Sequence, residues 1–278
     1  MEIKAIIGLS KNVGKTTFLN RYLKEIKDNN DFLLSSIGWD GELVDHIFGI
    51  PKPPIKVYKN HYVATYQKLI NNSFKELFLT DIENFFLGKL GVYKCINEDY
   101  VQIAGPSSSK EIEIFLNSII KNNFNISRII LDGAADRRYI LSFADNVILI
   151  TGPTFSNDYN ILIKATLAFI KLFFLPIANN DNNNNDFYYI SSLTSITKLN
   201  KDKNYLLNDP GKIVIKFEEL FHILDKYKIF LKKKPNLEKI VLNSFDANEL
   251  RFSIDLNVFK RDILTYFPDL EDKIYLLI

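Results

Sequence analysis

The sequence is poor in the residues that build metal clusters and disulfides. Its 278 residues contain one cysteine, Cys95, and three histidines, His46, His61 and His222. A single cysteine forms no intrachain disulfide and no cysteine-ligated zinc site, and the three histidines lack the spacing of metal ligands. We therefore expect neither a disulfide-stapled fold nor a Cys/His metal centre.

Long apolar runs and an excess of charge of one sign are also missing. Lys164 and Lys171 interrupt the most apolar segment, 161–177, and Lys4 and Lys11 interrupt the apolar run at the start of the chain. We expect no transmembrane span, no signal peptide and a cytoplasmic location. The formal net charge of +2 favours neither nucleic acid nor a membrane surface as a partner, and we expect neither.

What the chain does have is an apolar fraction of 47%, which is enough for a buried core. Apolar runs of strand length alternate with helical periodicity, as is typical of βαβ units. We predict an α/β fold with a mostly parallel sheet and helices on both faces. The predicted strands are 4–7, 32–37, 100–103, 128–131 and 147–150, and the predicted helices are 15–27, 109–121 and 157–175.

One segment, residues 8–17, has the pattern of a phosphate-binding loop. It reads Gly-Leu-Ser-Lys-Asn-Val-Gly-Lys-Thr-Thr, follows an apolar run and opens a helical pattern. Backbone N–H groups and the positive end of the helix would hold phosphate, Lys15 would neutralise the outer phosphates, and the Thr16 hydroxyl would ligate Mg²⁺. The strict pattern has its first glycine where this chain has Leu9, one residue after Gly8. The alternative is an ordinary strand-to-helix turn. The predicted nucleotide-binding residues are Gly8, Lys11, Asn12, Val13, Gly14, Lys15, Thr16, Thr17 and Arg137.

Two segments supply carboxylates for Mg²⁺ and for hydrolysis. Asp132 follows the apolar run 128–131, and the carboxyl ends of parallel strands face the ligand crevice. Asp40 and Glu42 follow the second predicted strand in a loop with two glycines. The alternatives are a cap for Asp132 and a turn with solvated acids for the other two. We assign Lys15, Asp40 and Asp132 to catalysis, and the predicted metal ligands are Thr16, Asp40, Glu42 and Asp132.

Two further segments admit both a functional and a structural interpretation. Gly105 and the serines 107–109 could donate hydrogen bonds to an anion, or Ser108 or Ser109 could simply cap the helix that follows. Arg137 or Arg138 could stabilise a phosphate, although arginines on a surface loop are common.

The remaining predictions concern the domain organisation. Residues 1–178 form the nucleotide-binding core, with an insertion at about 50–98. We expect a hairpin of 55–58 and 62–65 that turns at Asn60, then short helices, with 92–95 paired to 100–103. The Asn-rich segment 179–187 is expected to be a mobile surface loop. A C-terminal α/β extension, 188–278, packs on the core; its predicted strands are 188–190, 212–215, 239–242 and 274–277, and its helices are 217–227 and 256–267.

The order and spacing of five motifs resemble the small ATPase-like subunit of the lysine 5,6-aminomutase reactivase. The motifs lie at 8–17, 36–42, 51–53, 101–107 and 132–137, and the resemblance covers roughly the first 155 residues. More broadly, the loop is similar to those of dethiobiotin synthetase and the MinD-type P-loop NTPases. The resemblance implies ATP and Mg²⁺ as cofactors, with a MutS-like ATPase subunit and a cobalamin-dependent aminomutase as partners. The protein would then help to eject damaged cobalamin from an aminomutase that also uses pyridoxal phosphate.

Three alternatives stay open. A dethiobiotin synthetase-like ligase needs a lysine after the second strand, where this chain has Ser36-Ile37-Gly38-Trp39. A GTPase metallochaperone needs an Asn-Lys-x-Asp clamp, whereas Asn200-Lys201-Asp202 places its aspartate one residue early. The third alternative is a nucleotide-sensing interaction subunit with little turnover.

Overall fold

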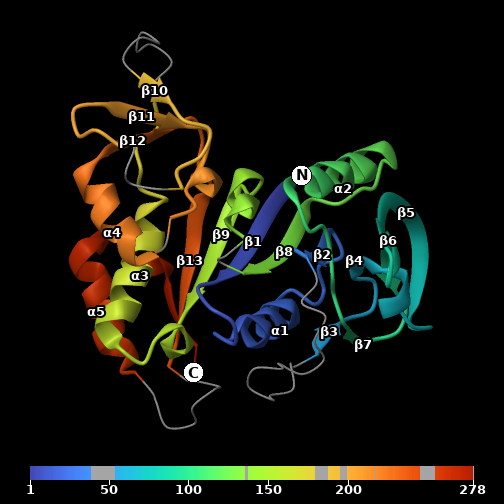
Figure 1. Cartoon of the computed structure of the whole chain (residues 1–278). Coiled ribbons are helices and arrows are strands. Elements are labelled where there is room, and N and C mark those ends of the chain that lie inside the picture. The colour runs from blue at the N-terminus through green and yellow to red at the C-terminus, as the bar shows by residue number, and fades with distance from the viewer. Residues whose placement is uncertain are drawn as a thin grey trace. The chain divides into compact units, whose positions relative to one another are not determined.

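The computed structural model describes residues 1–38, 54–134, 137–178, 187–194, 199–215, 217–244 and 254–277. The chain falls into two compact units, of which the first comprises Met1–Ile7 and Gly14–Gly133 and the second Gly8–Val13 and Ala134–Ile278. Both units combine helices with sheets that contain parallel strands (Figure 1), which confirms the predicted α/β class. The expected domain boundary after residue 178 stays a prediction.

The first unit is built on a sheet whose strands lie in the order β1-β8-β2-β4-β6-β5. β2 is parallel to both β8 and β4, and β6 is antiparallel to β4 and β5. A second, small sheet pairs β3 with β7. The strand bounds are β1 (Glu2–Gly8), β2 (Phe32–Ser36), β3 (Ile55–Val57), β4 (Tyr62–Tyr66), β5 (Phe74–Asn84), β6 (Gly88–Cys95), β7 (Asp99–Val101) and β8 (Arg128–Ala134).

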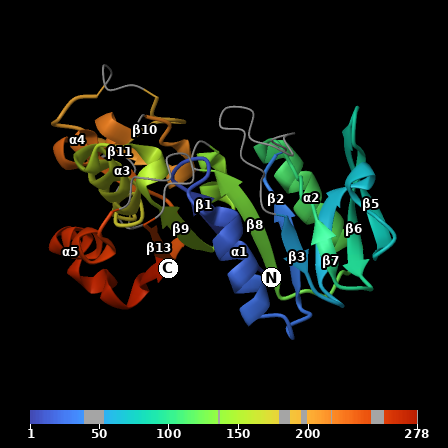
Figure 2. The same cartoon turned by 90° about the horizontal axis from the view of Figure 1, so that it is seen from below.

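Two α-helices of the first unit, α1 (Lys15–Glu25) and α2 (Ser109–Lys121), begin where the sequence predicts. α1 lies beside β3, and α2 packs against β5 (Figure 2). The start of α2 is set locally, because the Ser108 hydroxyl accepts from the Glu111 N–H at 3.2 Å while the Glu111 carboxylate accepts from the Ser107 N–H at 2.6 Å. This reciprocal cap confirms the structural interpretation of the serine segment.

The predicted hairpin of 55–58 and 62–65 is wrong. The chain does turn at Asn60, which has a φ of 74°, but β3 and β4 enter different sheets. β4 is buried from Val63 to Tyr66 and runs parallel to β2, so its partner lies about thirty residues away in the chain. A turn signal is local, whereas strand pairing depends on distant residues that cover both faces of the strand.

The predicted pairing of 92–95 with 100–103 is also wrong, and where several short helices were predicted the described residues form a single short 3₁₀ helix. Residues 74–95 form the long β5–β6 hairpin, preceded only by the 3₁₀ helix η1 (Gln67–Leu69). The Asn84 side chain tightens the hairpin turn by accepting from the Phe86 and Leu87 N–H groups. The insertion therefore does contain a hairpin, but a different one from that predicted.

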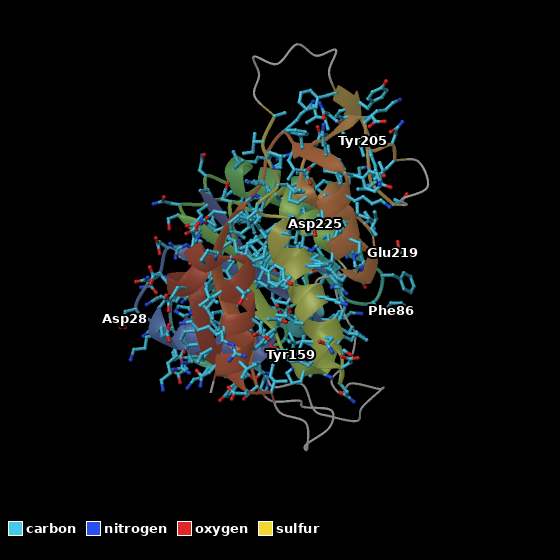
Figure 3. The ribbon with its side chains drawn as sticks, turned by 90° about the vertical axis from the view of Figure 1, so that its left-hand side faces the viewer. Asp28, Phe86, Tyr159, Tyr205, Glu219 and Asp225 are labelled. Carbon is cyan, nitrogen blue, oxygen red and sulfur yellow. The ribbon has the colours of Figure 1, made fainter. Side chains whose placement is uncertain are left out.

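The second unit has two parallel sheets, with strand orders β14-β13-β9 and β10-β11-β12. Helix α3 packs against α4 and α5. Lys171 pairs with Asp225, and the Tyr159 hydroxyl donates to Asp262 at 2.8 Å; Figure 3 labels Asp225 and Tyr159. The element bounds are β9 (Asn146–Thr151), α3 (Tyr159–Lys171), β10 (Phe187–Tyr189), β11 (Asn204–Leu207), α4 (Phe217–Lys226), β12 (Lys228–Leu231), β13 (Asn236–Asn243), α5 (Leu256–Tyr266) and β14 (Ile274–Leu277).

One predicted strand of the second unit, 212–215, is wrong. The segment forms the end of the 3₁₀ helix η5 (Pro210–Lys212), followed by a single bridge between Ile213 and Leu193. The buried Asp209 carboxylate accepts from the Gly211 N–H at 2.9 Å and so favours a tight turn over a strand. Throughout the described segments, every helix is too short or too polar to span a bilayer.

A fully buried histidine joins three parts of the first unit. His61 Nδ1 accepts from the Tyr58 N–H, and Nε2 lies 3.0 Å from the Lys27 carbonyl, to which it donates. Its ring also packs edge-on to Phe32, with ring centroids 4.7 Å apart. Burial lowers the pKa of His61 below its usual value of 6.5. The imidazole is therefore neutral, since a proton on Nδ1 would remove its acceptor for Tyr58.

We predict that His61 makes the stability of the protein depend on pH. The unfolded chain takes up a proton near pH 6.5 and the folded chain does so only at lower pH, so the free energy of unfolding should fall as pH drops from about 6.5 to the folded pKa. Urea unfolding at about pH 7.5 and about pH 5 measures this change. The difference should shrink in His61→Gln and persist in His222→Gln, whose side chain is exposed; an equal difference in all three proteins would refute the assignment.

Candidate functional site

The candidate site begins at the N-terminus of α1. Gly14 precedes the helix with φ 93° and ψ 17°, a left-handed conformation that favours glycine. Among the described residues, no side chain caps this end and no acidic residue lies in its first turn. By contrast, Ser108, Asp158 and Asp255 cap α2, α3 and α5. The N-terminus of α1, which is the positive end of the helix dipole, therefore begins with Lys15 and Thr16, which are both half-buried. The first turn contains no acidic residue that would neutralise this end.

Two residues of the loop before α1 have a positive φ, Asn12 at 57° and Gly14 at 93°. Backbone that alternates between positive and negative φ can turn successive N–H groups toward one point, as in known anion-binding loops. Lys11 and Thr17 are exposed, and Val13 is buried. Both the phosphate loop and a plain strand-to-helix turn stay possible interpretations of this segment, and the phosphate loop stays a prediction.

Leu9 occupies the position of the missing first glycine without disturbing the loop. Its side chain is buried, and its N–H donates to the Ile150 carbonyl at 2.8 Å. Because this N–H already donates to Ile150, the predicted phosphate contacts are left to the residues after Leu9. The departure from the strict glycine pattern therefore has a structural reason.

Asp132 lies at the carboxyl end of β8. Glu2 N–H donates to the Ser127 carbonyl at 2.8 Å and Glu2 pairs with Arg128, so β1 and β8 start together, and the two strands have equal length. Their carboxyl ends therefore meet at one edge of the sheet. The Asp132 carbonyl accepts from the Ile37 N–H at 2.8 Å and from the Ser36 hydroxyl at 3.2 Å. These bonds hold the half-buried Asp132 at the edge from which the loop departs.

At this edge of the sheet, Gly38 and Gly105 connect the end of β2 to the segment that follows β7. The Gly38 N–H donates to the Pro106 carbonyl at 2.7 Å, and the Gly105 N–H donates to the Gly38 carbonyl at 3.1 Å. A Cβ on Gly105 would lie 2.0 Å from the Ser36 carbonyl oxygen. The structure thus brings together three segments that the sequence singled out separately, namely 36–38, 105–107 and Asp132.

The two arginines after β8 have different surroundings. Arg138, in the 3₁₀ helix η2 (Arg138–Ser142), is buried; its Nη1 donates to the Ile213 carbonyl at 2.8 Å and its guanidinium lies 4.2 Å from the Phe217 ring centroid. Burial lowers the pKa of Arg138 to about 10. These contacts hold Arg138 within the second unit, so Arg137, which is half-buried, remains the candidate for phosphate contact.

Some predicted site residues lie outside the described part of the chain. These are Asp40, Glu42 and the motif 51–53. Their roles stay predictions.

The structure also adds residues that the motif analysis missed. The Thr154 and Ser10 hydroxyl oxygens lie 2.8 Å apart, and the Asn243 side-chain amide donates to the Val13 carbonyl at 3.1 Å. The sequence contained a signal for Asn243, which directly follows the predicted strand 239–242 and therefore lies at its carboxyl end.

No similar protein supplies a function for this site. A comparison of the chain with protein-family models, curated proteins and solved structures found no match.

Proposed function

We propose that this chain is a P-loop NTPase that binds ATP with Mg²⁺ through residues 8–17 and hydrolyses it. The observation that carries the proposal is the start of α1, where a left-handed Gly14 precedes Lys15 and Thr16 and no described side chain caps the helix. A triphosphate would accept hydrogen bonds from the open N–H groups, and Lys15 would neutralise its outer phosphates.

The described residues fit Mg²⁺ bound together with a phosphate better than a metal held by protein alone. No group of three or more His, Cys, Asp or Glu side chains gathers within the described ranges. Mg²⁺ commonly uses one or two carboxylates, several waters and the substrate phosphates. Thr16 and Asp132 would supply the protein ligands, with Asp40 and Glu42 as the further predicted ones. Bound Mg²⁺ would supply charge neutralisation during phosphoryl transfer.

Calorimetric titration tests the nucleotide proposal directly. We expect saturable binding of MgATP, weaker binding of ATP in the presence of a chelator, and measurable binding of magnesium tripolyphosphate, because the cradle contacts phosphate. Parallel titration with MgGTP establishes the base preference. If neither MgATP nor tripolyphosphate binds, the proposed function is wrong.

We predict that Asp132→Asn weakens the Mg²⁺-dependent affinity for ATP by about tenfold and changes the Mg²⁺-free affinity little. The amide keeps the size of the side chain but loses the charge that attracts the metal. Asp81→Asn, on the exposed surface of β5, is the matched control and should bind MgATP as the wild type does. Equal losses of affinity with and without Mg²⁺ would assign Asp132 a purely structural role.

The resemblance stated above supports a second step of the proposal, that the ATPase acts in a reactivating factor for a cobalamin-dependent aminomutase. Nucleotide would then favour one conformation of a complex with a MutS-like subunit. To move nearly the whole population into that conformation, the nucleotide must bind it more tightly than the other conformation by about 5 kcal/mol. Phosphate release that rises only when the aminomutase and the MutS-like subunit are added would support this role. Release that requires a diamine and bicarbonate would favour the ligase instead, and binding without turnover would favour the nucleotide sensor.

A further inference from the structure

The phosphate-loop segment 8–13 belongs to the second unit, and three contacts within that unit hold it. The Leu9 N–H donates to the Ile150 carbonyl at the end of β9, Ser10 and Thr154 share a hydrogen bond of 2.8 Å, and the Asn243 amide donates to the Val13 carbonyl at 3.1 Å. Asn243 ends β13, is only 9% exposed and lies 230 residues from Val13 in the chain. The last contact is the one nearest the predicted phosphate contacts.

The planarity of the peptide bond gives this contact a consequence for Gly14. The Val13 carbonyl and the Gly14 N–H belong to the same peptide unit, and in a trans peptide the two groups point in opposite directions. The described part of the chain contains no cis peptide bond. When Asn243 holds the Val13 carbonyl, the Gly14 N–H must therefore point away from Asn243.

We propose that Asn243 is a positioning residue for the phosphate cradle, which holds the Val13–Gly14 peptide so that the Gly14 N–H faces the bound phosphate. The inference rests on the proposed function and adds to it a residue that lies outside the loop motif. Asn243 touches no substrate in this role and acts through the loop. When the donor is already oriented, the peptide need not rotate as the anion binds. The free-energy cost of binding is then lower, and the affinity is higher.

The surroundings of Asn243 support a role that requires a fixed side chain. A Cβ on Gly152, which follows β9, would lie 2.8 Å from the Asn243 carbonyl oxygen and 3.2 Å from the Asn243 Cβ. Only a residue without a side chain allows β9 and the end of β13 to approach this closely. The close approach places the amide of Asn243 within reach of Val13.

The test compares Asn243→Asp with Asn236→Asp, a matched change at the exposed start of the same strand. At neutral pH the new carboxylate at 243 cannot donate to the Val13 carbonyl and repels it. We expect Asn243→Asp to weaken binding of both MgATP and magnesium tripolyphosphate by about tenfold, with Asn236→Asp unchanged. Calorimetry well below the melting temperature of each variant provides the affinities.

The two ligands separate the competing outcomes. A loss for MgATP alone would mean that Asn243 contacts the nucleoside, and it would overturn the proposal, as would unchanged affinity for both ligands. If the wild type binds neither ligand, the proposed function itself fails and the inference fails with it. Should Asn243→Asp not fold, Gly152→Ala displaces Asn243 without altering it. The same joint loss is expected there, and unchanged affinity for both ligands in a folded Gly152→Ala protein would refute the role.

Discussion

Lys15→Ala should abolish measurable binding of MgATP, a loss of about 100-fold or more in affinity. Lys15 is the first residue of α1, where the positive end of the helix and its own ammonium group would both attract the outer phosphates of a bound nucleotide. Alanine is the best helix former, so the helix itself should persist. Titration with MgATP measures the affinity, and circular dichroism measures the helix content.

The control for this change lies at the other end of the same helix. Lys24 is exposed in the last turn of α1, and Lys24→Ala removes the same charge far from Gly14. It should bind MgATP as tightly as the wild type does. Unaltered affinity in Lys15→Ala would mean that the loop is not the phosphate site.

Gly105→Ala should lower the free energy of unfolding by about 3 kcal/mol and the melting temperature by about 6–12 °C. The added methyl group would meet the Ser36 carbonyl oxygen at 2.0 Å and the Ser35 hydroxyl at 2.8 Å. Backbone atoms cannot rotate out of the way as a flexible side chain can. The segment must therefore separate from β2, which breaks the hydrogen bonds that join Gly38 to Gly105 and Pro106.

The loss of stability should be accompanied by weaker MgATP binding at low temperature, where the variant is still folded. Gly38 and Asp132 share the edge that the change disturbs, since the Asp132 carbonyl is bonded to Ile37 and Ser36. Lys110→Ala, exposed at the start of α2, is the control for thermal unfolding and should melt within about 1 °C of the wild type. If the melting temperature of Gly105→Ala changed equally little, the segment around Gly105 would accommodate the methyl group without loss of stability, and the prediction would be wrong.

Local chemistry explains which elements could be predicted from the sequence. The predicted bounds of α2 and β14 coincide with those of the structure. The start of α2 depends on Ser108 and Glu111, three residues apart, and such caps are visible in the sequence itself. The loop 8–17 was singled out for the same reason, because the phosphate-loop pattern is a run of adjacent residues.

The failures have the opposite cause. The turn at Asn60 was predicted correctly, yet β3 and β4 do not pair, because β4 finds its partner in β2 and β3 finds its partner in β7. Likewise, the pair Arg137-Arg138 indicated phosphate chemistry, but only packing against Ile213 and Phe217 decided that Arg138 is buried.

By itself, the sequence determined to within a few residues where most helices and strands lie, although it missed β5, β11 and β12, and it singled out one loop with the phosphate-loop pattern. These features depend on capping, periodicity and backbone preference over a few residues. Only the tertiary structure decided which strands pair, that Gly105 must lie against Ser36, and that Asn243 reaches Val13. The physical reason is that a strand offers the same hydrogen bonds to any neighbour, so burial of side chains from distant segments selects the partner.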